Sequence, residues 1–254
     1  MFLDVNGARL HALAFGDGPR TLVATGGWTG SWEVWEEPMA LLTAEGWRCI
    51  GYDHRGSGES PVDPGLITVE AMIDDVVGVL DALDVDRCVL AGESQGGAIA
   101  QYAAARHPER FTGLVLAAPA PTGRSERGDG FAAACRTDYP AAVDAFVTRC
   151  FPEPGVDHVK RWARHILLRA EPEQAARIIE MWGEDDVPDV DARRISLPTL
   201  IVHGTEDAIV PIELSRALVE LLPDAVLVEL EGVGHVPTMT RPSDVVDVLV
   251  RRFP

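Results

Sequence analysis

A serine between two glycines forms a short motif that can carry nucleophilic chemistry. Residues 92–96 read Gly-Glu-Ser-Gln-Gly, after an apolar run typical of a strand and before an alanine-rich run typical of a helix. The G-x-S-x-G nucleophile elbow requires this context. In so sharp a turn the serine backbone is strained, and a side chain at Gly92 or Gly96 would collide with the neighbouring strand or helix. The motif predicts that Ser94 is a nucleophile whose hydroxyl stands clear of the sheet, near the positive end of the helix.

Two residues far downstream could activate this hydroxyl. A serine hydroxyl is a poor nucleophile at neutral pH and needs a base, usually an imidazole that a carboxylate orients. Asp207 follows one compact apolar run, and His235 follows the last one. Both are therefore expected in loops at the carboxyl ends of strands, where the turn that carries Ser94 also emerges. We predict that Ser94, Asp207 and His235 form a catalytic triad in which His235 is the general base.

Other titratable residues lie near these positions in the sequence. Glu206 is an alternative to Asp207 as the acid, but adjacent loop residues usually point in different directions, which favours Asp207. Glu93 precedes the nucleophile and is interpreted as a residue that packs or hydrogen-bonds nearby. Three further histidines are interpreted as structural or solvated: His54, His107 and His203.

No residue pattern indicates a metal or a cofactor. The sequence contains no H-E-x-x-H motif and no cysteine pair spaced for zinc, and His158 and His165 lack a third ligand. No phosphate-binding loop of the Walker or dinucleotide type follows a predicted strand. The cysteines, at positions 49, 88, 135 and 150, form no C-x-x-C pair and are expected to be free thiols. The predicted chemistry needs no cofactor and no metal.

The composition argues against several kinds of partner. The 254 residues contain 22 Lys and Arg against 40 Asp and Glu, for a formal net charge of -18. This charge should repel phosphate backbones and anionic lipid head groups. The longest apolar stretches are too short to span a bilayer, and Asp4 and Arg9 interrupt the region where a secretion signal would be apolar. We expect a cytoplasmic protein that binds neither nucleic acid nor membranes.

The residues of the predicted triad require a scaffold of alternating strands and helices, and the sequence has this pattern. Asn6 and Gly7 separate the first two strand-like runs and favour a tight hairpin turn. Compact apolar runs, typical of strands buried on both faces, follow at 21–25, 48–52, 87–91, 113–117, 199–203 and 226–230. The pattern predicts an α/β fold with about eight mostly parallel strands flanked by helices.

Helical runs lie between many of these strands. They cover residues 69–83, 95–106, 213–222 and 243–251. In the first of them, apolar residues recur with helical spacing and form one stripe. Three acidic residues of this run are expected to face water: Asp74, Asp75 and Asp81.

The alternation stops between residues 121 and 197, where the pattern is only helical or loop-like. Prolines divide this segment into short pieces that could form about three or four helices. We interpret residues 1–120 and 198–254 as the core domain and residues 121–197 as a helical cap insertion. Because the insertion leaves after one predicted strand and returns before the next, it should lie over the carboxyl edge of the sheet, where ligands bind in open α/β sheets.

The motifs resemble the α/β-hydrolase superfamily over almost the whole chain. The resemblance rests on residues 26–31 (Gly-Gly-Trp-Thr-Gly-Ser), residues 53–60 (Asp-His-Arg-Gly-Ser-Gly-Glu-Ser), the elbow, and the loops that carry Asp207 and His235. The chain order Ser, Asp, His is that of the superfamily. The resemblance implies the α/β-hydrolase fold. The elbow style and the modest insertion are similar to the branch of 3-oxoadipate enol-lactonases and small esterases.

The resemblance also implies an oxyanion hole. In the family the loop after the third strand commonly reads His-Gly-x, and the backbone N–H of x donates to the oxyanion. Here Gly26 stands where the histidine is usual, Gly27 matches the glycine, and Trp28 would supply the N–H. The departure at Gly26 removes a side chain that often braces this loop. The second donor would be the N–H of Gln95, and losing one such bond typically costs about 2.7 to 4 kcal/mol of transition-state stabilisation.

The leading hypothesis is a serine hydrolase that cleaves a small carboxylic ester or lactone through an acyl-enzyme. Gly27 and Trp28 beside the elbow, with Trp162 and Trp182 of the insertion, are the expected substrate-binding residues. C–C bond hydrolases and cofactor-free perhydrolases share the triad and are alternatives. A small-molecule sensor of the same fold is an alternative of another class.

Overall fold

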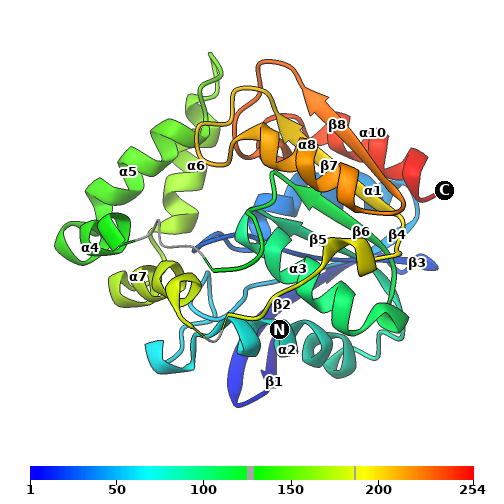
Figure 1. Cartoon of the computed structure of the whole chain (residues 1–254), viewed down its shortest axis with the longest axis horizontal. Helices are drawn as coiled ribbons and strands as arrows, with labels where there is room; N and C mark the ends of the chain where they lie inside the picture. Colours follow the sequence, from blue (N-terminus) through cyan, green and yellow to red (C-terminus); the bar gives the residue numbers. More distant parts are fainter. Residues whose placement is uncertain (125–128, 186) are drawn as a thin grey trace.

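In the computed structural model, which describes residues 1–124, 129–185 and 187–254, eight strands form one sheet (Figure 1). The strands are β1 (Phe2–Val5), β2 (Ala8–Phe15), β3 (Arg20–Thr25), β4 (Trp47–Tyr52), β5 (Cys88–Glu93), β6 (Phe111–Ala117), β7 (Thr199–Gly204) and β8 (Ala225–Leu230). Their spatial order is β1-β2-β4-β3-β5-β6-β7-β8. β2 is antiparallel to both β1 and β4, and the pairings from β4 to β8 are parallel. The predicted α/β fold with a mostly parallel sheet is confirmed.

Local sequence explains the antiparallel start of the sheet and its buried centre. Asn6 and Gly7 have φ values of 46° and 76°, in the left-handed region that a tight hairpin turn requires. β5 and β7 consist mainly of small and apolar residues and are buried along their whole length. Strands that are covered on both faces have this character. Their carboxyl ends lead into the segments that carry Ser94 and Asp207.

The α-helices are α1 (Glu36–Ala44), α2 (Val69–Ala82), α3 (Gln95–Arg106), α4 (Asp129–Thr137), α5 (Tyr139–Cys150), α6 (Asp157–Leu167), α7 (Pro172–Glu180), α8 (Ile212–Leu221), α9 (Pro237–Thr240) and α10 (Pro242–Arg252). Short 3-10 helices are η1 (Trp32–Trp35), η2 (Pro64–Leu66), η3 (Pro108–Arg110), η4 (Met181–Gly183) and η5 (Ala192–Arg194). α1 packs against α10, and α2 packs against α3. α4 to α7 lie between β6 and β7 in the sequence and gather at the left of Figure 1. We call residues 121–197 the helical insertion.

A buried ion pair ties the loop after β4 to α2. Arg55 is 2% exposed, and its Nε and Nη2 donate to the two carboxylate oxygens of Asp75 at 2.6 and 2.8 Å. Asn6 of the hairpin turn donates to the same carboxylate at 3.2 Å. Burial raises the pKa of Asp75 despite these hydrogen bonds. The expectation that Asp75 faces water is wrong because Arg55 reaches it from another segment; Asp74 and Asp81 are exposed.

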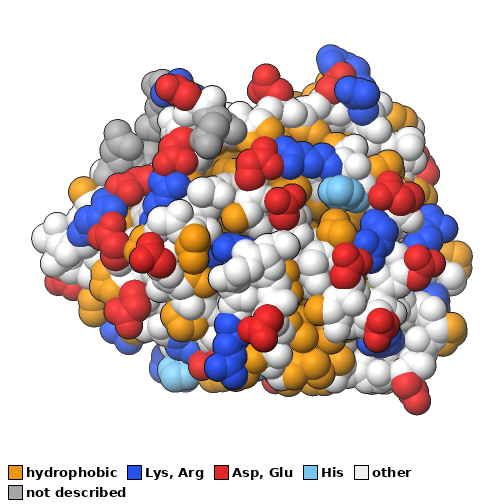
Figure 2. All heavy atoms as spheres, turned by 90° about the horizontal axis from the view of Figure 1, so that it is seen from below, with side chains coloured by type: hydrophobic (Ala, Val, Ile, Leu, Met, Phe, Trp, Pro, Cys, Tyr) orange, Lys and Arg blue, Asp and Glu red, His pale blue; other side chains and the backbone are white. Residues whose placement is uncertain are grey.

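The surface mixes charges of both signs. On the face in Figure 2, acidic and basic side chains are interspersed, with apolar side chains between them. Arginines pair with the abundant acids, as Arg106 does with Glu70 and Arg136 with Glu173. Within the described ranges, no helix combines the length and the apolar character that crossing a bilayer requires. The cysteines are free, as predicted, and they are buried.

Candidate active site

The predicted nucleophile lies on a strained turn between β5 and α3. Ser94 has φ 51° and ψ -119°, a conformation that residues with a side chain rarely adopt. A Cβ added to Gly92 would lie 2.3 Å from the carbonyl oxygen of Gly96, and a Cβ on Gly96 would lie 2.4 Å from the carbonyl oxygen of Gly26. Both distances are far below van der Waals contact, so the turn requires glycine at both positions of the motif.

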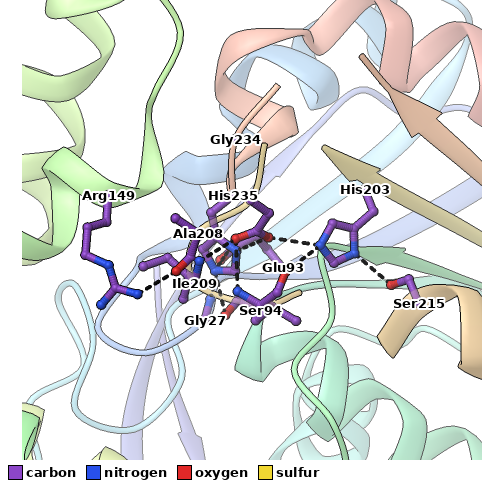
Figure 3. A network of polar contacts seen from close by, with 12 residues as sticks. Gly27, Glu93, Ser94, Arg149, His203, Ala208, Ile209, Ser215, Gly234 and His235 are labelled. Carbon is purple, nitrogen blue, oxygen red and sulfur yellow. Dashed lines mark hydrogen bonds and ion pairs between the residues drawn. The ribbon is translucent and has the colours of Figure 1, made fainter. Parts of the chain in front are cut away.

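Ser94, His235 and Asp207 come together at the carboxyl edge of the sheet, and Figure 3 labels Ser94 and His235 in this network. Nε2 of His235 lies 2.9 Å from Oγ of Ser94, and Nδ1 lies 2.7 Å from Oδ2 of Asp207. A carboxylate only accepts hydrogen bonds, so Nδ1 carries the proton and Nε2 presents its lone pair to the serine hydroxyl. This arrangement suits a base that takes the serine proton. The alternative acid, Glu206, is exposed.

Asp207 is fixed by donors on both of its oxygens. Oδ1 accepts from the N–H groups of Ile209 and Val210 at 2.8 and 2.9 Å. Oδ2 accepts from His235 and also from Nε2 of His203, at 3.0 Å. Burial alone would raise the pKa of Asp207, but the charge of His235 and these hydrogen bonds outweigh it and hold the pKa well below its usual range. Asp207 is therefore ionised and rigidly oriented.

His203 extends this network away from the nucleophile. Its Nε2 faces two acceptors at 3.0 Å, Oδ2 of Asp207 and the carbonyl oxygen of Val210, so Nε2 carries the proton. Its Nδ1 then accepts from the hydroxyl of Ser215 at 2.7 Å (Figure 3). The interpretation of His203 as structural or solvated missed this contact with the predicted acid. The position of His203 on a buried strand, four residues before Asp207, is the sequence signal that could have revealed this contact.

Glu93 is a second carboxyl group beside the imidazole. It is 5% exposed, and its Oε2 accepts from the N–H of Gly27 at 3.0 Å. Its Oε1 lies 3.5 Å from Nε2 of His235. Burial raises the pKa of Glu93 to about 7. Sequence reasoning placed Glu93 near the elbow as a packing or hydrogen-bonding residue but missed its contact with the predicted base.

The electrostatics of His235 reflect both carboxyl groups. Burial by itself would lower the pKa of His235, which is 1% exposed. The charge of Asp207, the hydrogen bond to it and the charge of Glu93 outweigh burial and raise the pKa above its ordinary value. An imidazolium formed when His235 takes a proton is therefore flanked by two carboxyl groups.

The loop that carries His235 is anchored on the helical insertion. The N–H of His235 donates to the carbonyl oxygen of Cys150 at 2.8 Å, and the N–H of Gly234 donates to Oε1 of Glu153 at 3.0 Å. A Cβ on Gly234 would lie 2.2 Å from the same carbonyl oxygen of Cys150. The contact is too close for any residue except glycine. The insertion therefore fixes the position of the predicted base.

The segment expected to form the oxyanion hole lies against the elbow. A Cβ on Gly27 would lie 2.6 Å from the Cβ of Ser94 and 2.9 Å from the backbone nitrogen of Gln95. Gln95 begins α3, so its N–H has no partner within the helix. Trp28 has φ 31°, a value unusual for a residue with a side chain. In the part of the chain that the structure describes, neither the N–H of Trp28 nor that of Gln95 donates to a protein acceptor.

A small apolar cavity opens onto the serine hydroxyl. Its volume is about 40 Å³, which is room for only a few water molecules. The core contributes Gly27, Trp28, Gly30, Val34, Glu93, Ser94, His235, Val236 and Met239, and the insertion contributes Phe146, Val147, Cys150, Phe151, Ala163, Ile166 and Leu167. Apart from the polar groups at its base, the lining is apolar, so the cavity suits a short hydrocarbon group.

Trp28 connects this cavity to the insertion. Its Nε1 donates to the carbonyl oxygen of Ala175 in α7 at 2.9 Å. Its ring packs against Phe131, Tyr139 and Phe146 of the insertion, with centroid separations of 4.8, 6.2 and 4.9 Å. Gly27 and Trp28 thus line the cavity, and their role in substrate binding stays a prediction.

The two tryptophans of the insertion do not line this cavity, and their role in substrate binding stays a prediction. Trp162 is 41% exposed and stacks on His165 at the surface. α6 turns Ala163 and Ile166 toward the cavity, whereas Trp162 lines a neighbouring hollow that shares Val34 and Met239 with it. Trp182 is buried and stacks on Tyr102 of α3. Which side of a helix a tryptophan occupies depends on where the helix begins and ends, and the prolines alone did not predict those boundaries.

Comparison with known proteins identifies the family of this chain. Residues 20–194 match the family model described as the alpha/beta hydrolase fold. The chain belongs to this family. Residues 177–253 also match a model described as TAP-like protein. A protein of Pseudomonas syringae that carries the name carbamate hydrolase RutD is 30% identical over 244 residues, which are 91% of this chain and 92% of that protein.

Solved structures place the whole chain in the same α/β-hydrolase fold. An enol-lactonase from Burkholderia xenovorans LB400 has a TM-score of 0.90 at 27% identity, over 100% of this chain and 99% of that one. A thermophilic esterase from Thermogutta terrifontis has a TM-score of 0.90 at 26% identity, over 100% and 97% of the two chains. The resemblance to the α/β-hydrolase superfamily that the motifs indicated is confirmed.

Proposed function

We propose that this α/β-hydrolase cleaves small carboxylic esters or lactones through an acyl-enzyme on Ser94. The observation that carries the proposal is the unbroken series of contacts from the serine hydroxyl through His235 to Asp207, at 2.9 and 2.7 Å, beneath an apolar cavity. The tautomer of His235 that this series requires leaves a lone pair facing the hydroxyl. A serine activated in this way attacks carbonyl carbon.

In the proposed reaction, Ser94 attacks the substrate carbonyl while Nε2 of His235 takes the hydroxyl proton. Asp207, held ionised by its donors, orients the imidazole and stabilises the imidazolium. The N–H groups of Trp28 and Gln95 receive the oxyanion of the tetrahedral intermediate. His235 then delivers its proton to the leaving oxygen. A water molecule, deprotonated by His235, then attacks the acyl-enzyme. The carboxylic acid is released, and His235 returns the proton to Ser94.

The cavity supports a short acyl group as the part of the substrate that lies next to Ser94. Its volume of about 40 Å³ and its apolar lining accept few methylene groups, each of which contributes about 0.8 kcal/mol when it is buried. The relatives named above include an enol-lactonase, an esterase and a protein named for carbamate hydrolysis. Esters, lactones and an aryl carbamate are therefore the substrates to compare.

The test is a substrate panel measured on the wild-type enzyme and on Ser94→Ala. We expect release of p-nitrophenol from short-chain p-nitrophenyl esters or opening of small lactones, and a loss of at least about a thousandfold in kcat/KM in Ser94→Ala. The variant should keep the circular dichroism spectrum and melting temperature of the wild type. Rapid labelling of Ser94 by a fluorophosphonate without turnover of any panel member would overturn the proposal in favour of a ligand sensor.

A further inference from the structure

Glu93 touches two separate parts of the proposed catalytic machinery at once. Its Oε2 accepts from the N–H of Gly27, next to Trp28 in the proposed oxyanion loop, at 3.0 Å. Its Oε1 lies 3.5 Å from Nε2 of His235, the nitrogen that also faces Ser94. We propose that Glu93 is a positioning residue that braces the oxyanion loop and sets the protonation state of His235. This inference rests on the proposed function.

The position of Glu93 in the fold brings its carboxyl group close to both partners. It is the last residue of β5, immediately before the nucleophile, and is 5% exposed. Gly27 approaches so closely that a Cβ on it would lie 2.7 Å from the carbonyl oxygen of Glu93. Figure 3 shows Gly27, Glu93, Ser94 and His235 gathered in one network. A carboxylate held between the loop and the imidazole can affect both.

The charges that surround His235 leave Glu93 without a permanent cation. Asp207 faces Nδ1 of the imidazole from the loop after β7, and His203 reaches Asp207 from β7 itself. The groups that approach from the insertion are the Cys150 thiol, Glu153 and Arg149, which donates to the carbonyl oxygen of Ala208. Within the described residues, the ion-pair contact of Glu93 is with His235 alone. Any compensating positive charge must therefore come from the protonated imidazole.

Glu93 and His235 consequently titrate as a coupled pair. Burial raises the pKa of Glu93 to about 7, and the pKa of His235 also lies above its ordinary value despite burial, because of Asp207 and Glu93. An ionised Glu93 stabilises the protonated form of His235, so His235 can act as a base only at higher pH. The same charge stabilises the imidazolium that forms during attack.

The test compares Glu93→Gln with the wild type across pH. Glutamine keeps an oxygen that accepts from the N–H of Gly27 but removes the charge beside His235. We expect the acid limb of the rate of Ser94 labelling by a fluorophosphonate to move to lower pH by about one unit or more. The NMR titration of the His235 ring should move in the same direction. Coincident titrations of the wild type and Glu93→Gln would overturn the proposed control of protonation.

Two further variants separate charge from bracing. Glu153→Gln is the control, because Glu153 is another buried carboxylate that accepts from the N–H of Gly234 but does not contact the imidazole. We expect the acid limb of the labelling rate in Glu153→Gln to lie within about 0.3 pH unit of the wild type. A charge in contact with the imidazole causes a larger shift. Glu93→Leu also removes the acceptor for Gly27. Its labelling rate at high pH should fall about tenfold below that of Glu93→Gln, the effect of a displaced oxyanion donor. Equal plateaus in Glu93→Gln and Glu93→Leu would overturn the bracing role.

These measurements separate this inference from the proposed function. Neither labelling nor the NMR titration requires turnover of an ester. A wild-type protein that is labelled but hydrolyses no substrate of the panel contradicts the proposed function, while a shifted His235 titration in Glu93→Gln still supports the role of Glu93. An active enzyme with an unshifted titration contradicts the role of Glu93 alone.

Discussion

Asp207→Asn should inactivate this enzyme by reversing the tautomer of its base. The N–H groups of Ile209 and Val210 donate to Oδ1 at 2.8 and 2.9 Å, so the amide oxygen of an asparagine must take that position. Its NH2 group then occupies the position of Oδ2, opposite Nδ1 of His235 and Nε2 of His203. His203 still has the carbonyl oxygen of Val210 as an acceptor. Because two donors cannot pair, His235 must carry its proton on Nε2. The lone pair that faces Ser94 is then lost.

The opposite amide orientation does not rescue the variant. It would leave the two backbone N–H groups that now bind Oδ1 without an acceptor, at a cost of about 1–3 kcal/mol each. The orientation with the wrong tautomer is therefore preferred. In a serine protease triad the equivalent change lowers kcat by about 10⁴-fold, which corresponds to about 5.4 kcal/mol at 1.36 kcal/mol per factor of ten. We expect a loss of this order here.

The assay is kcat/KM on the best short-chain p-nitrophenyl ester, with Glu206→Gln as the matched control. Glu206 is the adjacent carboxylate and is exposed, so its replacement should change kcat/KM by less than about twofold. Asp207→Asn should retain the fold, since its size and two of its hydrogen bonds are kept. An Asp207→Asn enzyme with a tenth or more of wild-type activity, or a larger loss in Glu206→Gln, would refute the assignment of the acid.

Two other variants test the cavity and the scaffold. Phe146→Ala enlarges the cavity beside Trp28. The ratio of kcat/KM for octanoyl esters to kcat/KM for butanoyl esters should therefore rise at least tenfold. The four extra methylene groups, at about 0.8 kcal/mol each, set an upper limit of about two-hundredfold. An unchanged ratio would mean that the acyl chain lies elsewhere. Arg55→Met leaves Asp75 buried without its partner and should lower the free energy of unfolding by about 3–5 kcal/mol in urea titrations. The exposed ion pair of Arg106 with Glu70 provides the control, because Arg106→Met should lower the free energy of unfolding by less than about 1 kcal/mol. Equal losses in Arg55→Met and Arg106→Met would contradict the reasoning.

The sequence predicted those features that depend on local context. A glycine on each side of Ser94, a strand before it and a helix after it are enough to indicate the elbow, because backbone sterics admit few other residues there. Asp207 and His235 were predicted for a related reason. Each follows a strand of a mainly parallel sheet, and the carboxyl ends of parallel strands meet at one edge.

The individual side-chain contacts of several buried residues were not predicted. The contact of Glu93 with His235 spans 142 positions of the chain, and no local pattern specifies which way a buried carboxylate points. The helical periodicity around Asp75 led us to expect that its side chain faces water. Instead, Arg55 from the loop after β4 forms an ion pair with it. Where Trp162 and Trp182 point depends on how the insertion packs on the core, which no local pattern specifies. Tertiary packing decides such positions.

The most direct test of the central claim is the site at which the enzyme becomes acylated. Wild-type protein and Ser94→Ala are mixed with a short-chain p-nitrophenyl ester, quenched in acid within milliseconds, digested and analysed by mass spectrometry. The account predicts an acyl group on the peptide that contains Ser94, formed together with a burst of p-nitrophenol, and neither in Ser94→Ala. Acylation of another residue, or a burst of equal size in Ser94→Ala, would contradict it.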